Sequence, residues 1–389
     1  MPKPGATGYC VHNIAEFLAT EGNDVTVICY QDNLDYIPDC NMKVLKIKVP
    51  GFLNSYRSKS KLINTVNNYR SRLCKLILLN KYPLRSTATV KHFAKAAKKV
   101  AENEDNVTVI ASVNPVEAVA AFPLIKKKMP NAKLIYYCAD TLSNECGNSG
   151  ILPPEKREAM GKKWEMKLFE ISDLIFIMEC HKNHYFSKDF EGFKNKMRTV
   201  NFPLIKKSNT EISQKSEKTI VYAGTLYRDL RNPSYICSVL PYVLRDSGYK
   251  AIFMGGGDCN DILHDAEKAS GGLIEYLGLL EHTAAEKHIA AAAVLLSIGN
   301  RESQMAPSKI YEYMATGKPI IHIYSWDGDT CLEPLGKYGN VLIIKDGDLD
   351  AVEKITAFLR KAVNIDFETV EQIFYSSTPK YTASLIEKI

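Results

Sequence analysis

The stretch PSKIYEYMATGKPII, residues 307–321, carries side chains whose types and spacing could do chemistry. Ser308 and Lys309 stand in the first turn of a predicted helix, and Glu312 stands one turn later, on the same face as Ser308. Unpaired backbone N–H groups and a cation at a helix start suit a phosphate, and the carboxylate could accept both hydroxyls of a ribose. The segment therefore predicts a site for a nucleotide diphosphate. An ordinary helix cap beside a surface glutamate is the alternative.

Glycine-rich turns after predicted strands supply further candidate phosphate contacts. The segments YAGTLYRDLRNP (222–233) and FMGGGDCNDIL (253–263) each follow an apolar strand, and glycines there let the backbone approach a ligand closely. Arg228 and Arg231 follow the first turn and offer forked donors for phosphate oxygens. We predict a pyrophosphate cradle here, with a steric role for each glycine as the alternative. The predicted donor-binding glycines are Gly224, Gly255 and Gly257.

The candidate site needs a scaffold, and the hydrophobic pattern predicts one of alternating strands and helices. Short apolar runs recur between amphipathic stretches, which is typical of parallel sheets covered on both faces. The expected strands of the first half span 24–30, 43–49, 106–112, 132–138 and 173–178, with helices over 8–22, 60–80, 86–103, 115–128 and 154–171. The expected strands of the second half span 218–224, 250–256, 273–278, 292–298, 319–324 and 340–344. We therefore predict two Rossmann-like, doubly wound α/β domains that face a cleft.

The length of 389 residues also predicts two domains. The polar stretch 206–218 resembles a linker. We expect an N-terminal domain over 1–202, a C-terminal domain over 203–365, and C-terminal helices over 366–389 that pack back on the N-terminal domain. The glycine loop PGATG begins at residue 4 with no strand before it. The first, central strand of the N-terminal sheet is therefore expected to be missing, unless another segment takes its place.

The amino-acid composition and the cysteine pattern indicate the cellular compartment in which the protein is expected. Hydrophobic residues make up 46% and charged residues 24% of the chain, as in soluble globular proteins. The sequence has no apolar run of about 18 residues and no secretory signal pattern. The ten cysteines form no C-x-x-C pair, and Cys29, Cys138 and Cys180 lie in or beside apolar runs. We therefore expect buried thiols in a cytoplasmic protein, without disulfides or a metal site.

Together these motifs resemble the retaining glycosyltransferases of family 4, which have the GT-B fold. PSKIYEYMATGKPII, after a strand ending in VLLSIGNRES, is similar to their donor-binding segment. YAGTLYRDLRNP and FMGGGD are similar to their phosphate loop and the glycine turn that follows. In the first half, GATGYCVHNIAEFLATEGNDVTVI, LIYYCADTL and RTVNFPLI resemble the first glycine loop, a segment lining the cleft, and the crossing between domains.

The resemblance implies a function. Members bind a nucleotide sugar in the second domain and an acceptor in the first, and they transfer the sugar with retained configuration, usually without a metal or other cofactor. Glu312 matches the second acid of their E-x7-E pattern, whereas Gln304 holds the first position, with Glu302 close by. Asp140 matches an acid of the first domain, but Ala139 stands where many members have histidine. A catalytic histidine is therefore not carried over.

The resemblance and the motifs together define the predicted site. The predicted catalytic residues are Asp140, Arg228, Arg231 and Lys309. The predicted donor-binding residues are Gly224, Gly255, Gly257, Glu302, Gln304, Ser308, Lys309 and Glu312. The predicted acceptor side comprises Gly5, Gly8 and Asp140. Surface or helix-cap positions are expected for His12, His181, His184 and His282.

The net charge of +6 hides an asymmetry along the chain. Residues 1–200 carry 30 basic and 20 acidic side chains, and within 40–101 there are 15 basic and no acidic ones. Apolar residues interleave with these cations, which suits helices that lie on an anionic bilayer. A solvated basic face is the alternative, and the chain shows no nucleic-acid-binding motif. We predict peripheral, salt-sensitive binding to the inner face of the membrane through residues 55–99.

The leading hypothesis is a metal-independent hexosyltransferase of cell-surface polysaccharide synthesis, which uses a nucleotide-sugar donor and a glycan or lipid-linked acceptor. Ala139, Gln304 and the missing strand favour a second hypothesis, a catalytically weak nucleotide-sugar-binding partner subunit. A third is a GT-B enzyme of another type, such as a sugar-nucleotide epimerase. Hydrolysis of nucleotide sugars would separate the first hypothesis from the second.

Overall fold

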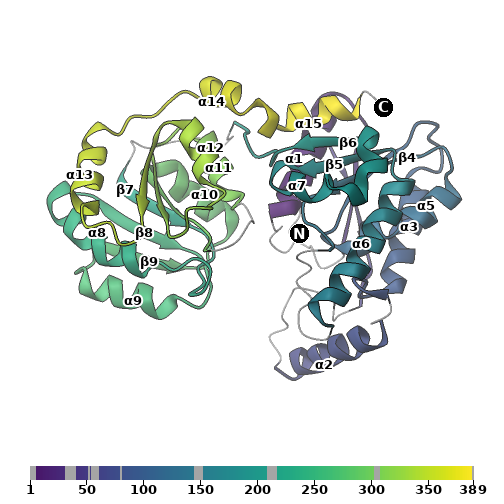
Figure 1. Cartoon of the computed structure of the whole chain (residues 1–389), viewed down its shortest axis with the longest axis horizontal. Coiled ribbons are helices and arrows are strands. Elements are labelled where there is room, and N and C mark those ends of the chain that lie inside the picture. Colours follow the sequence, from purple (N-terminus) through teal and green to yellow (C-terminus); the bar gives the residue numbers. More distant parts are fainter. Residues whose placement is uncertain are drawn as a thin grey trace. The chain divides into compact units, whose positions relative to one another are not determined.

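The computed structural model describes residues 6–30, 41–50, 53, 61–78, 81–143, 152–207, 217–301 and 307–387. The chain divides into two compact units (Figure 1). Unit 1 comprises Met1–Pro203 and Pro379–Ile389, and unit 2 comprises Leu204–Thr378. Among the described residues, no helix combines the length and the apolar character needed to span a membrane.

Unit 2 is built on one sheet of six parallel strands in the order β12-β11-β10-β7-β8-β9. The strands are β7 (Glu217–Ala223), β8 (Lys250–Met254), β9 (Ile274–Gly278), β10 (Ala292–Ile298), β11 (Ile320–Tyr324) and β12 (Val341–Lys345). The strand order reverses between β7 and β10. In open α/β sheets ligands bind beyond the carboxyl ends of the strands at such a switch point.

The helices of unit 2 cover this sheet on both faces (Figure 1). They are α8 (Ser234–Ser247), α9 (Asn260–Ala269), α10 (His282–Ala291), α11 (Lys309–Ala315), α12 (Leu332–Tyr338), α13 (Ala351–Lys361) and α14 (Phe367–Ile373). The central strands read as continuous apolar runs because both of their faces are covered. In β10, for example, Val294 and Leu295 are fully buried. Burial of each such side chain contributes about 1.5–3 kcal/mol, so the sheet core forms a rigid base for the strand ends.

Unit 1 contains two parallel sheets. One pairs β1 (Thr26–Tyr30) with β2 (Lys43–Ile47), and the other has the order β3 (Thr108–Ser112), β4 (Lys133–Cys138), β5 (Leu174–Met178) and β6 (Met197–Val200). Every residue of β5 is buried, whereas β1 is mostly half-buried and β3 is buried only at its C-terminal end. In the described part of the chain no strand joins β1 to β3, and the expected loss of a central strand stays a prediction.

Unit 1 also contains α-helices, which come before, between and after these strands in sequence order. They are α1 (Ala6–Thr20), α2 (Lys61–Ile77), α3 (Thr87–Val100), α4 (Val116–Val119), α5 (Phe122–Lys128), α6 (Pro154–Ile171), α7 (Lys182–Tyr185) and α15 (Pro379–Ile386). Helix α3 packs on β1, β2, α4 and α5, so one apolar core lies beneath both sheets.

Several boundaries differ from the expectation. The expected helix over 115–128 is two short helices, α4 and α5, and strand β6 was not expected at all. The C-terminal residues divide between the units: α14 packs on α11 and α12 in unit 2, whereas α15 packs on α1 in unit 1. Most of the expected linker, residues 208–216, lies outside the described residues.

Candidate functional site

Arg231 lies at the switch point of unit 2 and is held there by both flanking strand ends. Its Nε and Nη2 donate to Asn300 Oδ1 at 3.1 and 2.7 Å, and its Nη1 donates to the carbonyl oxygen of Thr225 at 3.1 Å. Thr225 follows β7, and Asn300, which is 5% exposed, follows β10. The guanidinium is therefore a fixed, forked cation between the two strands at which the sheet order reverses.

Helix α11 is anchored over the same place by Tyr313. The backbone N–H of Ala223, at the end of β7, donates to the Tyr313 hydroxyl at 2.7 Å, and this hydroxyl donates to the carbonyl oxygen of Ala223 at 3.3 Å. Burial raises the pKa of Tyr313 far above its usual value; the charge of Glu312 adds to this rise, whereas that of Arg231 opposes it. Tyr313 therefore fixes α11, which carries Glu312, to the end of β7, two residues before the Thr225 carbonyl that binds Arg231.

Lys309 and Glu312 engage each other on α11. Lys309 Nζ donates to Glu312 Oε2 at 2.5 Å, and the two side chains are 31% and 29% exposed. Ser308 is the N-cap of the helix, and its side chain makes no capping hydrogen bond. A ligand can therefore reach both members of this pair from solvent. The remaining residues predicted for the donor sugar, Glu302 and Gln304, lie outside the described residues.

Arg228 is separated from Arg231, although the two were predicted to act together. Its guanidinium pairs with Asp261 of α9, and the two side chains are 46% and 62% exposed. The hydrogen bond and charge of Asp261 raise the pKa of Arg228. Its backbone N–H donates to Asp258 at 2.9 Å. An exposed ion pair of this kind contributes little to stability because solvent screens it, so Arg228 is a loosely held, exposed cation.

The predicted glycine turns pack on each other, backbone to backbone. The N–H groups of Gly224 and Leu226 donate to the carbonyl oxygens of Met254 and Gly256, both at 2.9 Å. Gly255 and Gly257 have φ values of +144° and +129°, and a Cβ on either would lie within 1.8 Å of a carbonyl oxygen of the facing turn. The steric alternative therefore explains why these residues are glycines. Their contact with a donor stays a prediction.

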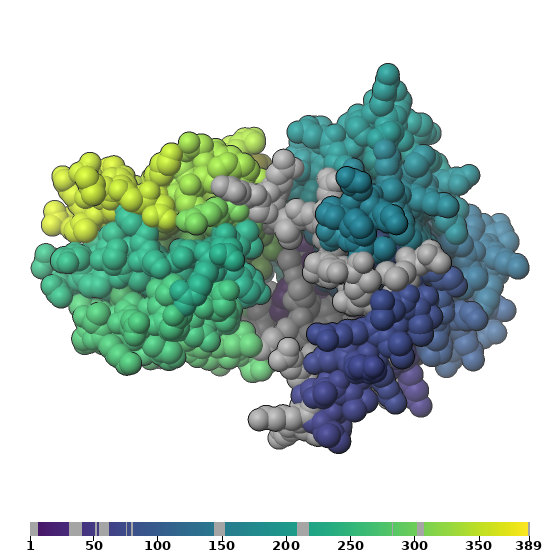
Figure 2. All heavy atoms as spheres, turned by 60° about the horizontal axis from the view of Figure 1, so that its bottom comes forward, coloured from purple at the N-terminus to yellow at the C-terminus, as the bar shows by residue number. Residues whose placement is uncertain are grey.

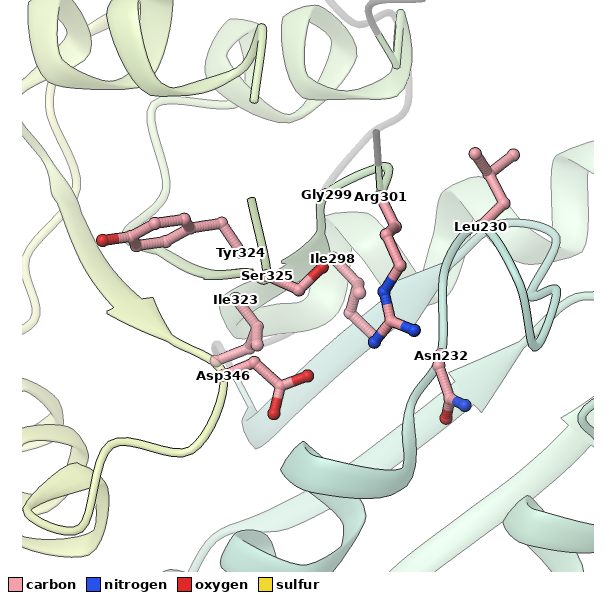
Figure 3. A pocket seen from close by; sticks show the side chains of 9 residues that line it. All are labelled: Leu230, Asn232, Ile298, Gly299, Arg301, Ile323, Tyr324, Ser325 and Asp346. Atoms are coloured by element: carbon pink, nitrogen blue, oxygen red, sulfur yellow. The ribbon is translucent and has the colours of Figure 1, made fainter. Parts of the chain in front are cut away.

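A small hollow opens beside this cluster at the ends of β10, β11 and β12 (Figure 3). Leu230, Asn232, Ile298, Gly299, Arg301, Ile323, Tyr324, Ser325 and Asp346 line it. The side chain of Arg301 extends into the hollow (Figure 3), and its backbone N–H donates to the carbonyl oxygen of Leu230 at 2.7 Å. This contact ties the end of β10 to the loop that carries Arg231.

A buried network that the sequence did not reveal lies behind the same strand ends. His322 Nδ1 is 3.1 Å from Ser297 Oγ, and His322 Nε2 is 3.2 Å from Asp329 Oδ2. Asp329 Oδ1 accepts from the N–H of Cys331 at 2.8 Å, and a Cβ on Gly299 would lie 1.6 Å from Asp329 Oδ2. Burial raises the pKa of Asp329, but hydrogen bonds from His322 and Cys331 outweigh burial and lower it.

The side chains of His322, Asp329 and Cys331 are close enough to hold a metal ion. Both carboxylate oxygens and both imidazole nitrogens already have polar neighbours at hydrogen-bonding distance. We therefore interpret this network as a brace that fixes the loop after β11 against the end of β10. In the sequence, the feature that could have indicated this network is the histidine inside the apolar run PIIHIY.

Unit 1 gathers a second cluster at the ends of β4 and β5. Asp140 follows β4 and His181 follows β5; the two strands are adjacent, with Cys138 paired to Ile177. Burial raises the pKa of Asp140, and His181 and a hydrogen bond from Thr7 of α1 oppose this rise. Burial lowers the pKa of His181, and the charge of Asp140 opposes this fall.

The structure confirms one expectation and adds to it. His181 was expected at the surface or at a cap, and it is the N-cap residue of α7. It is also partly buried, and its charge acts on the predicted site residue Asp140, which the sequence did not indicate because the two residues approach only when β4 and β5 pair. Gly8 lies in the first turns of α1, close to Thr7, whereas Gly5 lies outside the described residues.

The loop that follows Asp140 is fixed by a buried carboxylate on α6. Glu165 is fully buried, and its Oε1 accepts from the N–H groups of Leu142 and Ser143 at 2.6 and 3.3 Å and from the Tyr185 hydroxyl at 2.8 Å. The hydroxyl of Ser143 donates to Oε2 at 2.8 Å and lies 2.9 Å from His184 Nε2. His184, whose side chain is 21% exposed, is therefore partly at the surface and also part of an internal network.

Comparison with known proteins bears on both units. Residues 217–360 match the family model described as glycosyl transferases group 1, and no curated protein sequence matches the chain. HepE of Anabaena, solved in complex with UDP and glucose, is 15% identical, with 98% of this chain and 92% of that chain covered and a TM-score of 0.51. WaaG, a glycosyltransferase involved in lipopolysaccharide biosynthesis, is 13% identical, with 99% and 97% covered and a TM-score of 0.50.

Structural similarity at this level of sequence identity is evidence for the fold alone. It confirms the predicted fold class of two Rossmann-like domains. The sequence match covers most of unit 2, including Arg231, Lys309 and Glu312. Residues 217–360 are therefore a glycosyl transferases group 1 domain, in a chain that has the GT-B fold.

Proposed function

We propose that the chain is a hexosyltransferase that moves a sugar from a nucleotide-sugar donor to a glycan or lipid-linked acceptor in cell-surface polysaccharide synthesis. The observation that carries the proposal is the guanidinium of Arg231, held by Asn300 and Thr225 at the switch point of a glycosyl transferases group 1 domain. A fixed, forked cation at this place suits the diphosphate of such a donor.

The donor contacts follow from this placement. Arg231 and Lys309 bind the diphosphate, and Glu312 accepts hydrogen bonds from the ribose hydroxyls. Lys309 already pairs with Glu312, so its ammonium is shared between the carboxylate and the phosphate when a donor is bound. Arg228 reaches the diphosphate only after leaving Asp261, and we assign it the weaker role.

In the reaction, the bond between the sugar and the diphosphate breaks, the acceptor hydroxyl oxygen forms the new bond to the sugar, and its proton passes to the leaving diphosphate. Negative charge grows on the leaving diphosphate, and a preorganised cation stabilises that charge most in the transition state. Arg231 supplies such a cation without reorganising. Retention of configuration and independence from metals and cofactors are part of this proposal, and the resemblance of the motifs to family 4 supports them.

Unit 1 supplies the acceptor side in this proposal. Asp140 accepts a hydrogen bond from the acceptor hydroxyl, and His181 and Thr7 hold the carboxylate in place. Gly8, in the first turn of α1, leaves space for the acceptor, and Gly5 keeps its predicted role on the acceptor side. HepE was solved with UDP-glucose, so UDP-sugars are the first donors to test.

We also propose a cytoplasmic protein that attaches peripherally to the inner face of a membrane through residues 55–99. The absence of acidic residues between 40 and 101 supports an anionic partner. Such attachment would bring unit 1 to a lipid-linked acceptor.

A thermal-shift screen with UDP-, GDP- and ADP-sugars tests the donor proposal. A donor at 100 times its dissociation constant should stabilise the protein by about 2.7 kcal/mol, and Arg231→Ala should weaken this shift. Donors that bind should then be hydrolysed slowly in the absence of an acceptor. Binding without hydrolysis or transfer would favour the partner-subunit alternative. Ala139 and Gln304 support that alternative because they depart from the family pattern of site residues. No shift with any donor would overturn both.

A further inference from the structure

Helix α2 displays its apolar side chains to solvent. Seven of its large apolar residues are between 45% and 77% exposed, and they are Leu62, Ile63, Val66, Tyr69, Leu73, Leu76 and Ile77. Spacings of three and four residues place most of them on one face. The helix therefore carries a continuous apolar stripe, which is called the α2 stripe below.

The opposite face of α2 is polar, yet this face is the more covered one. Asn64, Asn67, Ser71 and Cys74 are partly buried, and their spacing puts them together. A helix of a globular protein normally turns its apolar face to the core and its polar face to water. In α2 this arrangement is inverted, so packing among the described residues of unit 1 does not explain the α2 stripe.

Helix α3 provides an internal comparison, because it comes from the same basic region. Its buried residues include Val90, Phe93 and Ala94, whereas Lys91 and Lys95 are exposed. This is the ordinary arrangement, and the lysines of α3 form a solvated face. The structure therefore separates the two halves of the region 55–99: α3 offers charge alone, and α2 offers charge and apolar surface.

The charge around the α2 stripe points to the kind of partner. Arg70 and Arg72 of α2 are exposed, and the helix contains no acidic residue. Figure 1 shows the helix at the edge of unit 1, away from the sheets, and its side chains lie on the face that Figure 2 displays. At 1.5 Å per residue it is about 26 Å long, which suits a helix lying along a bilayer surface.

We propose that α2 docks in the interfacial layer of an anionic bilayer, with the α2 stripe inserted among the lipids and its arginines at the headgroups. This deepens the membrane attachment proposed above and does not depend on the donor site. It also changes the expected response to salt. Screening shortens from about 10 Å at 0.1 M to about 3 Å at 1 M salt, so charge-only attachment would be released, whereas inserted apolar side chains stay bound.

Co-sedimentation of the full chain with vesicles tests the proposal. We expect binding to vesicles of phosphatidylcholine and phosphatidylglycerol at low salt, with a substantial fraction still bound at 1 M salt. The double variant Tyr69→Ser, Leu73→Ser should lower the bound fraction at least about tenfold at both salt concentrations. The matched control Leu349→Ser, Val363→Ser removes two exposed apolar residues from unit 2 and should bind as the wild type does.

A second measurement reports insertion directly. In a Tyr69→Trp variant, emission should shift to shorter wavelength when anionic vesicles are added. Wild-type binding by the Tyr69→Ser, Leu73→Ser variant, no emission shift, or complete release at 1 M salt would overturn the proposal. Self-association without vesicles that this variant abolishes would show instead that the α2 stripe joins two copies of the chain. Because the affected residues lie far along the sequence from unit 2, donor-induced thermal shifts should be unchanged, which separates this test from that of the proposed function.

Discussion

Replacing Asn300 by alanine should impair catalysis by releasing Arg231, without touching the substrate. Asn300 Oδ1 accepts from two guanidinium nitrogens of Arg231, Nε and Nη2, at 3.1 and 2.7 Å. In the variant, Arg231 keeps the contact of Nη1 with the carbonyl oxygen of Thr225 and its interaction with the Tyr222 hydroxyl. The guanidinium would then lose two of the hydrogen bonds that fix its orientation, and its two-point fit to a diphosphate would be weakened.

The size of the expected fall in kcat/KM follows from these hydrogen bonds. A hydrogen bond to a charged group contributes about 1.5–3 kcal/mol, and each 1.36 kcal/mol of lost transition-state stabilisation is about tenfold in rate. We therefore expect kcat/KM to fall about 10- to 150-fold in Asn300→Ala. Arg231→Ala should lose more, because it removes the cation itself. In the Arg231→Ala background the second substitution should change kcat/KM by less than about twofold, because the two residues act as one unit.

The assay is donor hydrolysis or transfer with the sugar nucleotide that gives the largest thermal shift. Thermal melting of each variant shows whether the fold is kept. Arg245→Ala is the matched control, because Arg245 packs over Tyr242 on α8 with its Cζ 5.7 Å from the ring centre, outside the cluster. Additive losses in the double variant would refute the reasoning, since Asn300 would then act independently of Arg231.

Three further predictions follow from the two clusters. Glu312→Gln should raise the donor dissociation constant while the melting temperature stays the same, and wild-type affinity measured by calorimetry would remove the ribose assignment. Glu165→Ala should lower the free energy of unfolding by about 3 kcal/mol or more, because it leaves several buried donors without an acceptor; denaturant unfolding measures this loss, and a smaller one would show that water replaces the carboxylate. Unfolded histidine takes up its proton near pH 6.5, whereas the folded pKa of His181 is lower. Stability should therefore fall as the pH drops below about 6.5, and His181→Gln should reduce that fall; identical pH profiles of melting temperature would contradict the assignment.

Much of the fold was predictable from the sequence because it follows from local pattern. Strands and helices of a doubly wound sheet differ in the period of their apolar residues, and most expected strands lie within about two residues of the observed ones. The placement of Ser308, Lys309 and Glu312 at the start of one short helix was predictable for the same reason, whereas the ion pair between Lys309 and Glu312 was not predicted. Strand β6 was missed because four residues carry too little periodic signal.

Contacts between distant strand ends were decided by the tertiary structure. Arg228 and Arg231 look equivalent in the sequence, but the register of β7 against β8 and β10 directs one to Asp261 and the other to Asn300. His181 meets Asp140 only through the pairing of β4 with β5. Helix α2 is a second case that the sequence could not decide. Its periodicity defines an apolar stripe, but whether other parts of the protein cover that stripe depends on packing with residues distant in the sequence.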